Sequence, residues 1–114
     1  MKSDKIDYQD FLKIEICVGT VLNAEENNNL KKPSIILTID FGNKIGVKKS
    51  SAQLKENYNC YDLIHKQIIA VTNFYPKQVG KTISEVLVLG FPDKNDEPIL
   101  ISPDFQIING KRLY

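Results

Sequence analysis

The sequence has 114 residues, of which 42% are hydrophobic, and its formal net charge is +1. This length predicts one domain over residues 1–114, with the composition of an ordinary globular protein. The chain has no apolar run long enough to span a membrane, and its first residues lack the apolar centre of a signal peptide. We therefore expect a cytoplasmic protein with no membrane partner. The near-zero charge leaves a polyanionic partner open, provided that lysines cluster locally.

The chain begins with a short amphipathic segment. Tyr8, Phe11 and Leu12 stand at positions i, i+3 and i+4, which predicts a short helix over residues 7–13. Asp7 is a candidate N-cap for this helix.

From Ile14 the hydrophobic period changes to two, which is typical of strands. The first strand is long, with Gly19 as the expected bend, and Gly42–Asn43 predicts a tight turn after the second. Ser50 and Gln53 match a capping box, which predicts a helix over residues 51–58. The predicted strands cover residues 14–26, 34–41, 44–49, 67–75 and 85–90.

Three strands, a helix and two further strands are the element order of the five-stranded oligonucleotide/oligosaccharide-binding (OB) fold, a Greek-key barrel. The sequence therefore predicts an all-β protein whose barrel spans residues 14–90. Closure of the barrel would remove the exposed edges of its short strands. Residues 91–114 form a C-terminal extension.

Apolar side chains at both ends of the chain exceed what such a barrel can bury. Exposed, they would form a large apolar patch, which suggests contact with a second copy about a twofold axis. The alternative is that these segments fold back on their own barrel. The candidate dimer-interface residues are Tyr8, Phe11, Leu12, Ile99, Ile101, Phe105 and Ile107.

Polar and basic side chains on the later strands indicate a site for RNA. Lysines can contact phosphates, an exposed aromatic ring can stack on a base, and a carboxylate can accept a hydrogen bond from a base amino group. Some of these residues also have structural interpretations: Ser50 as a helix cap, Asn73 as a partner of backbone groups, and the lysines as solvated side chains. The candidate RNA-binding residues are Lys48, Lys49, Ser50, Asn73, Tyr75, Lys77, Lys81, Ser84 and Glu85.

Phe74 and Tyr75 are neighbours in a predicted strand and should point to opposite faces. One of them is expected in the core, and the other could stack on a base.

The sequence offers no convincing catalytic group. His65 is the only histidine, and no serine or cysteine has an evident base beside it. Cys17 and Cys60 are expected to be reduced and are poor candidates for a metal site. Residues 80–82 match the end of a phosphate-binding loop, but the earlier glycine of that motif is missing. We expect a protein without enzymatic activity, metal or cofactor.

The chain resembles the family of OB-fold tRNA-binding domains, and within it the CsaA group of secretion-related chaperones. The resemblance runs from about residue 8 to residue 110. It implies a homodimer joined through the N-terminal helix and the C-terminal strands, with tRNA bound near the loop between strands four and five. It also supports a second interpretation, a chaperone or export factor for unfolded polypeptides. The motifs that carry it are residues 10–13, 19–21, 39–42, 45–53, 73–76 and 84–90.

Four positions depart from the pattern of the resembled family. Cys17 replaces an arginine, Gln78 a second basic residue, Leu87 a methionine, and residues 27–29 a His-Pro element. These changes predict weaker tRNA binding than the family pattern would give, without changing the fold.

Overall fold

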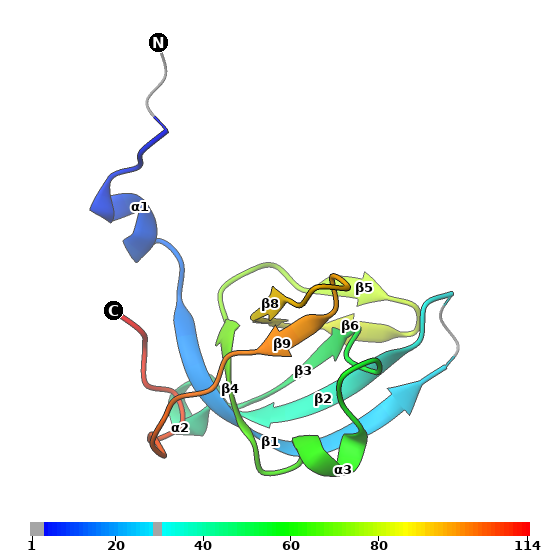
Figure 1. The fold of residues 1–114 in the computed structure, drawn as a ribbon. Helices are drawn as coiled ribbons and strands as arrows, with labels where there is room; N and C mark the ends of the chain where they lie inside the picture. The colour runs from blue at the N-terminus through cyan, green and yellow to red at the C-terminus, as the bar shows by residue number, and fades with distance from the viewer. Residues whose placement is uncertain (1–3, 29–30) are drawn as a thin grey trace.

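A computed structural model describes residues 4–28 and 31–114 of the chain (Figure 1). Strands dominate it, and its helices are short. The elements are α1 (Tyr8–Leu12), β1 (Ile16–Asn27), β2 (Ser34–Asp40), α2 (Gly42–Ile45), β3 (Val47–Ala52), α3 (Cys60–Leu63), β4 (Gln67–Val71), β5 (Lys77–Val79), β6 (Thr82–Ser84), β7 (Leu87–Val88), β8 (Gly90–Pro92) and β9 (Pro98–Leu100).

The main sheet is antiparallel and has the strand order β3-β2-β1-β4-β7. It curls so that its two ends approach each other, and the Glu85 backbone N–H donates to the Lys49 carbonyl at 2.8 Å. This bond links β3 to the residues just before β7. The prediction of an all-β, OB-like five-stranded barrel is confirmed.

The core lies inside this curled sheet, where apolar side chains from its long strands meet. Gly19 of β1 packs closely there, because a Cβ at this position would come within 2.7 Å of Ile39 Cγ2. The irregularity in the β1–β2 ladder falls between Val21 and Asn23 and not at Gly19. The largest fully buried side chains are Phe41, Ile35, Leu37, Ile39, Leu54, Leu63 and Ile68.

The predicted helix over residues 51–58 is wrong. Ser50 and Ser51 belong to β3, where they pair with Leu37 and Ile36 of β2. The capping-box pattern was overridden because the strand ladder already uses the backbone of both serines. The helix between the third and fourth strands of the barrel is α3 instead, capped by the Asn59 side chain, which accepts from the Asp62 N–H at 2.9 Å.

Other boundaries also differ from the predictions. Residues 42–45 form the short helix α2 and not a two-residue turn. The fourth strand of the barrel ends at Val71, since Thr72–Phe74 leave the ladder. The expected loop 77–81 belongs to a β-hairpin, β5–β6, and residues 85–90 are divided between β7 and the start of β8.

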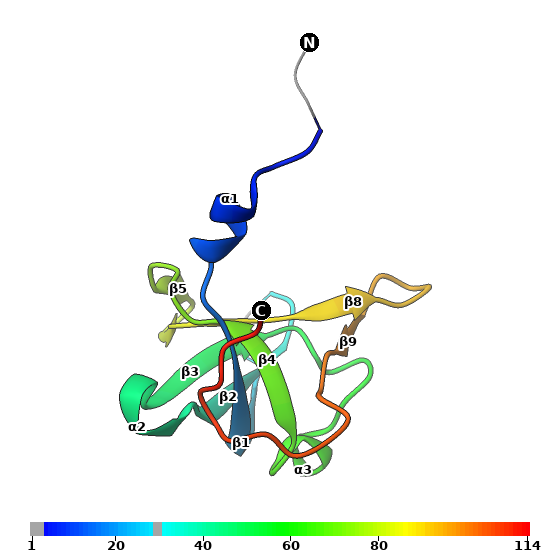
Figure 2. The ribbon, with the colours of Figure 1, turned by 90° about the vertical axis from the view of Figure 1, so that its left-hand side faces the viewer.

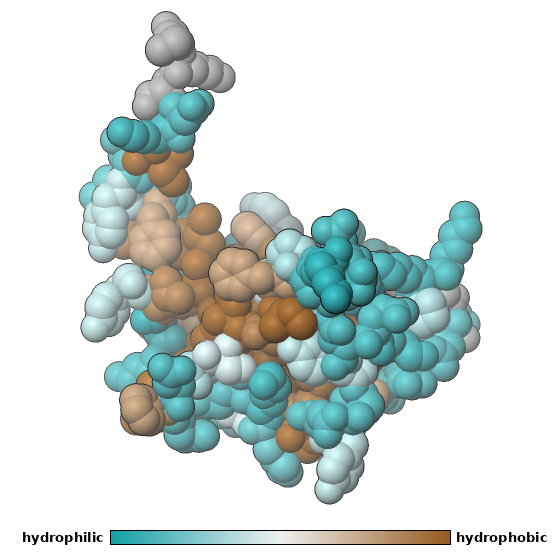
Figure 3. All heavy atoms as spheres, in the orientation of Figure 1, coloured by the Kyte–Doolittle hydropathy of each residue, from teal (hydrophilic) through white to brown (hydrophobic). Residues whose placement is uncertain are grey.

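The helix α1 projects away from the barrel (Figures 1 and 2) and has no buried residue. Asp7 occupies its N-cap position, as predicted, and its backbone N–H donates to Asp10 Oδ2 at 3.2 Å. Apolar side chains form a band from α1 across the middle of the barrel face, whereas hydrophilic ones cover the side on which the β8–β9 turn lies (Figure 3). No helix within residues 4–28 and 31–114 is long and apolar enough to cross a bilayer.

The C-terminal segment folds back on its own barrel along part of its length. Gly110 N–H donates to Val18 O at 2.8 Å, and Leu113 N–H donates to Ile16 O at 2.8 Å, so this segment runs along β1. The Arg112 guanidinium donates to the carbonyls of Leu12 and Ile14 at 2.6 and 3.1 Å. The tail therefore holds the junction between α1 and β1.

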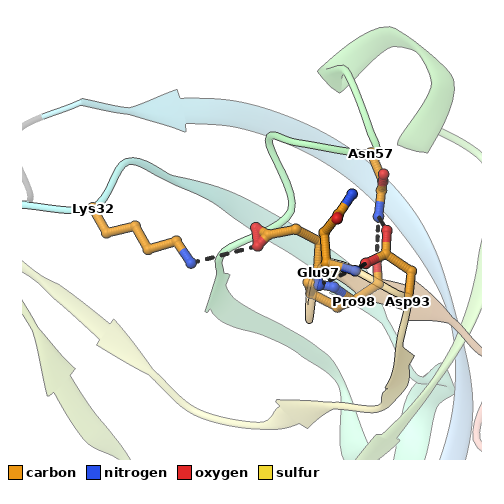
Figure 4. Close-up of polar contacts among 6 residues, drawn as sticks. Lys32, Asn57, Asp93, Glu97 and Pro98 are labelled. Atoms are coloured by element: carbon orange, nitrogen blue, oxygen red, sulfur yellow. Dashed lines mark hydrogen bonds and ion pairs between the residues drawn. The ribbon is translucent and has the colours of Figure 1, made fainter.

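The β8–β9 hairpin is tied to the barrel by a polar cluster (Figure 4). The Asp93 carboxylate accepts from Asn57 Nδ2 at 3.0 Å and from the backbone N–H groups of Asn95 and Glu97 at 2.8 and 3.0 Å. These donors lower the pKa of Asp93, with the Asn57 side chain as the largest cause. Lys32 Nζ lies 3.6 Å from Glu97 Oε2 and adds a second link.

Candidate nucleic-acid interface

The open side of the barrel carries a pocket of about 370 Å³, which we call the aromatic pocket. Its wall combines two exposed aromatic rings with apolar strand residues, and its polar groups are two serines, one glutamate and one lysine. It is lined by Ser51, Phe74, Tyr75, Lys77, Val79, Ser84, Glu85, Val86 and Leu87.

A second pocket of about 350 Å³, the serine pocket, adjoins the first. The two share Ser51, Lys77, Val79 and Leu87 in their linings. The serine pocket continues toward the β8–β9 hairpin, where Pro98 contributes to its wall. Together the two pockets form one concave surface between β3 and the hairpins β5–β6 and β8–β9.

Glu85 joins this surface to β3. Its Oε1 accepts from the Lys49 backbone N–H at 3.0 Å, and its Oε2 lies 3.9 Å from Lys48 Nζ. The side chains of Lys48 and Glu85 are each about one-third exposed, at 35% and 36%. Lys48 is thus brought to the site through Glu85, whereas Lys49 takes part through its backbone.

Hydrogen bonds between serines connect neighbouring strands at the site. Ser84 Oγ accepts from the Ser51 backbone N–H at 3.0 Å, and Ser51 Oγ lies 3.0 Å from Ser34 Oγ. Ser50 is buried and lines the serine pocket. These contacts fix the end of β3 against β6.

Lys77 and Lys81 lie on the β5–β6 hairpin. Lys77 begins β5, is exposed and lines both pockets, whereas Lys81 is exposed in the turn and lines neither. The turn is held by Gln78 Nε2, which donates to the Gly80 carbonyl at 2.6 Å, and Gly80 adopts φ +61°. The hairpin therefore presents the Lys77 ammonium to the concave surface and carries that of Lys81 at its turn.

Asn73 lies apart from both pockets. Its Oδ1 accepts from the Glu15 N–H at 2.8 Å, and its Nδ2 donates to the Lys13 carbonyl at 2.8 Å. Of the two interpretations drawn from the sequence, the amide thus serves backbone groups, at the junction between α1 and β1. Ser84 and Glu85 instead accept hydrogen bonds from backbone N–H groups of β3.

Neither Phe74 nor Tyr75 belongs to the core, contrary to the expectation that one of them would. Tyr75 is 97% exposed and Phe74 is 51% exposed, and both line the aromatic pocket. The alternation rule did not apply because residues 72–76 lie outside the strand ladder.

Four residues that line the aromatic pocket were not among the candidates drawn from the sequence: Ser51, Val79, Val86 and Leu87. Reading residues 50–52 as strand would have revealed Ser51, because the side chains of Ser50 and Ser51 then alternate across a sheet. No local pattern distinguished Val79 and Leu87 from core residues.

The two cysteine thiols are free. Burial raises the pKa of both Cys17 and Cys60, which keeps them in the neutral thiol form and makes them poor nucleophiles. Within residues 4–28 and 31–114, no group of three or more histidine, cysteine, aspartate or glutamate side chains is arranged to hold a metal ion.

A family model described as "Putative tRNA binding domain" matches residues 16–112, most of the chain. The chain belongs to this family of tRNA-binding domains. Its curated relatives include methionine–tRNA ligases of Methanococcoides burtonii, 34% identical over 89% of the chain, and of Thermococcus onnurineus, 26% identical over 98%. The chain spans only 14% and 15% of these two ligases, so the likeness covers one domain of each.

Solved structures match over the whole fold. The chaperone CsaA from Bacillus anthracis is 43% identical, with a TM-score of 0.89 over 96% of this chain and 99% of that one. CsaA from Picrophilus torridus is 44% identical, with a TM-score of 0.88 over 96% and 100%. A protein related to methionyl-tRNA synthetase from Pyrococcus horikoshii is 25% identical, with a TM-score of 0.86 over 98% and 100%. The resemblance to stand-alone tRNA-binding domains close to CsaA is confirmed.

Proposed function

We propose that this protein binds tRNA without transforming it, through the concave surface between β3 and the β5–β6 hairpin. The observation that carries the proposal is the aromatic pocket, where Phe74 and Tyr75 are exposed beside the Lys77 ammonium. Exposed aromatic rings beside cations can bind single-stranded segments of RNA, because bases stack on the rings and phosphates are attracted to the positive charge. Membership of the tRNA-binding domain family supports tRNA as the RNA.

The distribution of charge supports the same side of the molecule. The net charge is only +1, so long-range attraction of RNA is weak and local contacts must supply the affinity. Lys77 and Lys81 are exposed on the hairpin, whereas Lys49 of β3 takes part at the site through its backbone. Lys48 lies near the Glu85 carboxylate and contributes less free charge to a phosphate.

We further propose that the protein acts as a homodimer in the cytoplasm. Tyr8 and Leu12 of α1 are exposed, and no residue of this helix is buried against the barrel. Of the other proposed interface residues, Ile99, Phe105 and Ile107 are also exposed, whereas Phe11 and Ile101 are half-buried. A partner copy covering this face would bury apolar surface, which favours association. One tRNA could then contact two sites, which strengthens weak binding.

Salt dependence tests the proposal directly. Binding of labelled tRNA is measured by fluorescence anisotropy at several salt concentrations. Neutralising about five phosphates should give a slope of log Kobs against log salt of roughly −3.5 to −4.5. A slope near zero, or no binding at low salt, would contradict RNA binding at this surface.

A second function is favoured by the likeness to the two CsaA structures, which are described as chaperones. In that case the apolar band in Figure 3 would hold an extended, unfolded polypeptide. The same titration with a permanently unfolded polypeptide should then show binding that is nearly independent of salt. The two functions are separable because only the RNA complex depends on counterion release.

A further inference from the structure

The aromatic pocket has an unusual charge pattern for an RNA site. Lys77 and Glu85 both line it, so a cation and a carboxylate share one small space. A phosphate placed beside Glu85 would be repelled, whereas one beside Lys77 would be attracted. The sugar–phosphate chain is therefore best placed on the Lys77 side, with the base directed toward Glu85.

The carboxylate retains an acceptor for such a base. Glu85 Oε1 is already bonded to the Lys49 N–H, but Oε2 lies 3.9 Å from Lys48 Nζ, beyond hydrogen-bond distance. An ionised carboxylate accepts hydrogen bonds and donates none. A ligand group that approaches Oε2 must consequently bring its own N–H.

The serine hydroxyls of the pocket are less available to a base, because they already have hydrogen-bond partners. Ser84 Oγ accepts from the Ser51 N–H and lies 3.5 Å from the Val86 carbonyl, so its donor and acceptor roles have partners. Ser51 Oγ is within hydrogen-bond distance of Ser34 Oγ. Apart from Lys77, which is placed on the phosphate side, and the Tyr75 hydroxyl, Glu85 is the polar group left to discriminate between bases.

The size and wall of the pocket suit a flat ring. Its volume of about 370 Å³ lies at the lower end of the range of roughly 300–1,000 Å³ found for small-ligand sites. Phe74, Tyr75 and Leu87 supply aromatic and apolar surface on which a base can stack.

The geometry points to Glu85 as a specificity-determining residue: the aromatic pocket takes an unpaired nucleobase that carries an exocyclic amino group, and disfavours uracil. This inference rests on the proposed function, since it concerns RNA at the same site. Cytosine and uracil differ at position 4, where cytosine has an amino donor and uracil a carbonyl acceptor. At position 4 the uracil carbonyl would face the carboxylate without a proton between them, so uracil could approach Oε2 only through its ring N3–H.

The test uses short single-stranded oligonucleotides, because they isolate base preference from tRNA shape. Hexacytidylate and hexauridylate, each with the same dye, are titrated at low salt and followed by anisotropy. The wild-type protein should bind hexacytidylate about tenfold more tightly than hexauridylate. Glu85→Gln keeps an oxygen for the Lys49 N–H but can also donate, so its two affinities should become nearly equal. The matched control Glu25→Gln, at an exposed position of β1, should retain the wild-type ratio.

A second variant keeps the inference falsifiable if Glu85→Gln perturbs the barrel. Tyr75 is 97% exposed, so Tyr75→Leu should leave the melting temperature unchanged. This variant should weaken both oligonucleotides by a similar factor, because it removes stacking and leaves Glu85 in place. Unchanged affinity for both would overturn the base-binding assignment of the pocket.

The remaining outcomes separate failure of the inference from failure of the proposed function. Equal binding of the two oligonucleotides by the wild type, with tRNA binding intact, overturns the inference alone. If the protein binds neither tRNA nor any of the oligonucleotides, both the inference and the proposed function are overturned. Binding of a lysine-containing hexapeptide that is tighter than that of hexacytidylate and is lost in Glu85→Gln would overturn the inference in favour of a peptide site.

Discussion

The side chain of Gln67 and the backbone of Ile107 form a closed pair of hydrogen bonds. Gln67 Nε2 donates to Ile107 O at 2.6 Å, and Gln67 Oε1 accepts from Ile107 N–H at 2.9 Å. The side-chain amide thus takes the place of a partner strand. Because Gln67 opens β4 and is buried, this pair anchors the C-terminal extension to the barrel.

Replacing this amide should destabilise the protein. In Gln67→Ala the Ile107 backbone loses both partners, and we expect the free energy of unfolding to fall by about 1–3 kcal/mol. Urea unfolding at one fixed protein concentration measures the change. The matched control is Gln106→Ala, which removes the same amide from an exposed position and should cost less than about 0.5 kcal/mol. Equal losses in the two variants would show that the anchor contributes nothing.

The two hairpin lysines should carry part of the RNA affinity. The double variant Lys77→Ala/Lys81→Ala should weaken tRNA binding and reduce the magnitude of the salt slope by about 1.5–2, because two phosphate contacts are lost. The control Lys44→Ala/Lys66→Ala changes the net charge equally but lies off the β5–β6 hairpin, since Lys44 is in α2 and Lys66 directly precedes β4. An unaltered slope in the first variant would move the phosphate contacts elsewhere on the barrel.

A charge on α1 should disrupt the proposed dimer. Tyr8 is exposed on the projecting helix, and in Tyr8→Asp a carboxylate would have to be buried against the partner copy. Sedimentation velocity should show the shift from dimer to monomer. Tyr61 is also an exposed tyrosine in a short helix, but it lies on α3, so Tyr61→Asp should remain dimeric. A dimeric Tyr8→Asp would refute the interface assigned to α1.

The cluster at the β8–β9 turn should respond to acid. The donors around Asp93 hold its pKa below the ordinary value, so the ionised carboxylate stabilises the folded state. This contribution is complete above the pKa of the unfolded carboxyl and is lost as pH falls through the lower pKa of the folded one. Unfolding of the wild type across that acidic range should therefore be steeper in pH than that of Asp93→Asn.

Asp104→Asn provides the control for this comparison, because it removes an exposed carboxylate from the C-terminal extension without touching the turn. Its pH profile should follow the wild type. Identical profiles for Asp93→Asn and the wild type would mean that the hydrogen bonds around Asp93 do not stabilise the fold.

The capping box at Ser50 shows where local patterns misled. Ser50–Gln53 has the residues of a helix start, yet Ser50 and Ser51 continue β3, because pairing with β2 satisfies their backbone. The same error hid Ser51 from the predicted site. For Asn73 the sequence left two interpretations open, base recognition and hydrogen bonding to the backbone. The structure shows the second, because the Asn73 amide bonds backbone groups at the α1–β1 junction.

The barrel could be predicted from local patterns, because alternation of apolar and polar residues along β1 and β2 records which face of each strand is buried. The residue types also identified Lys77, Lys81 and Tyr75 as candidates for RNA binding. Which of these residues share a pocket became clear from the three-dimensional arrangement alone. The aromatic pocket depends on the Lys49–Glu85 bonds and the Ser51–Ser84 contact, which join residues more than thirty positions apart. Contacts between such distant residues depend on how the sheet curls and closes, and no local periodicity encodes that.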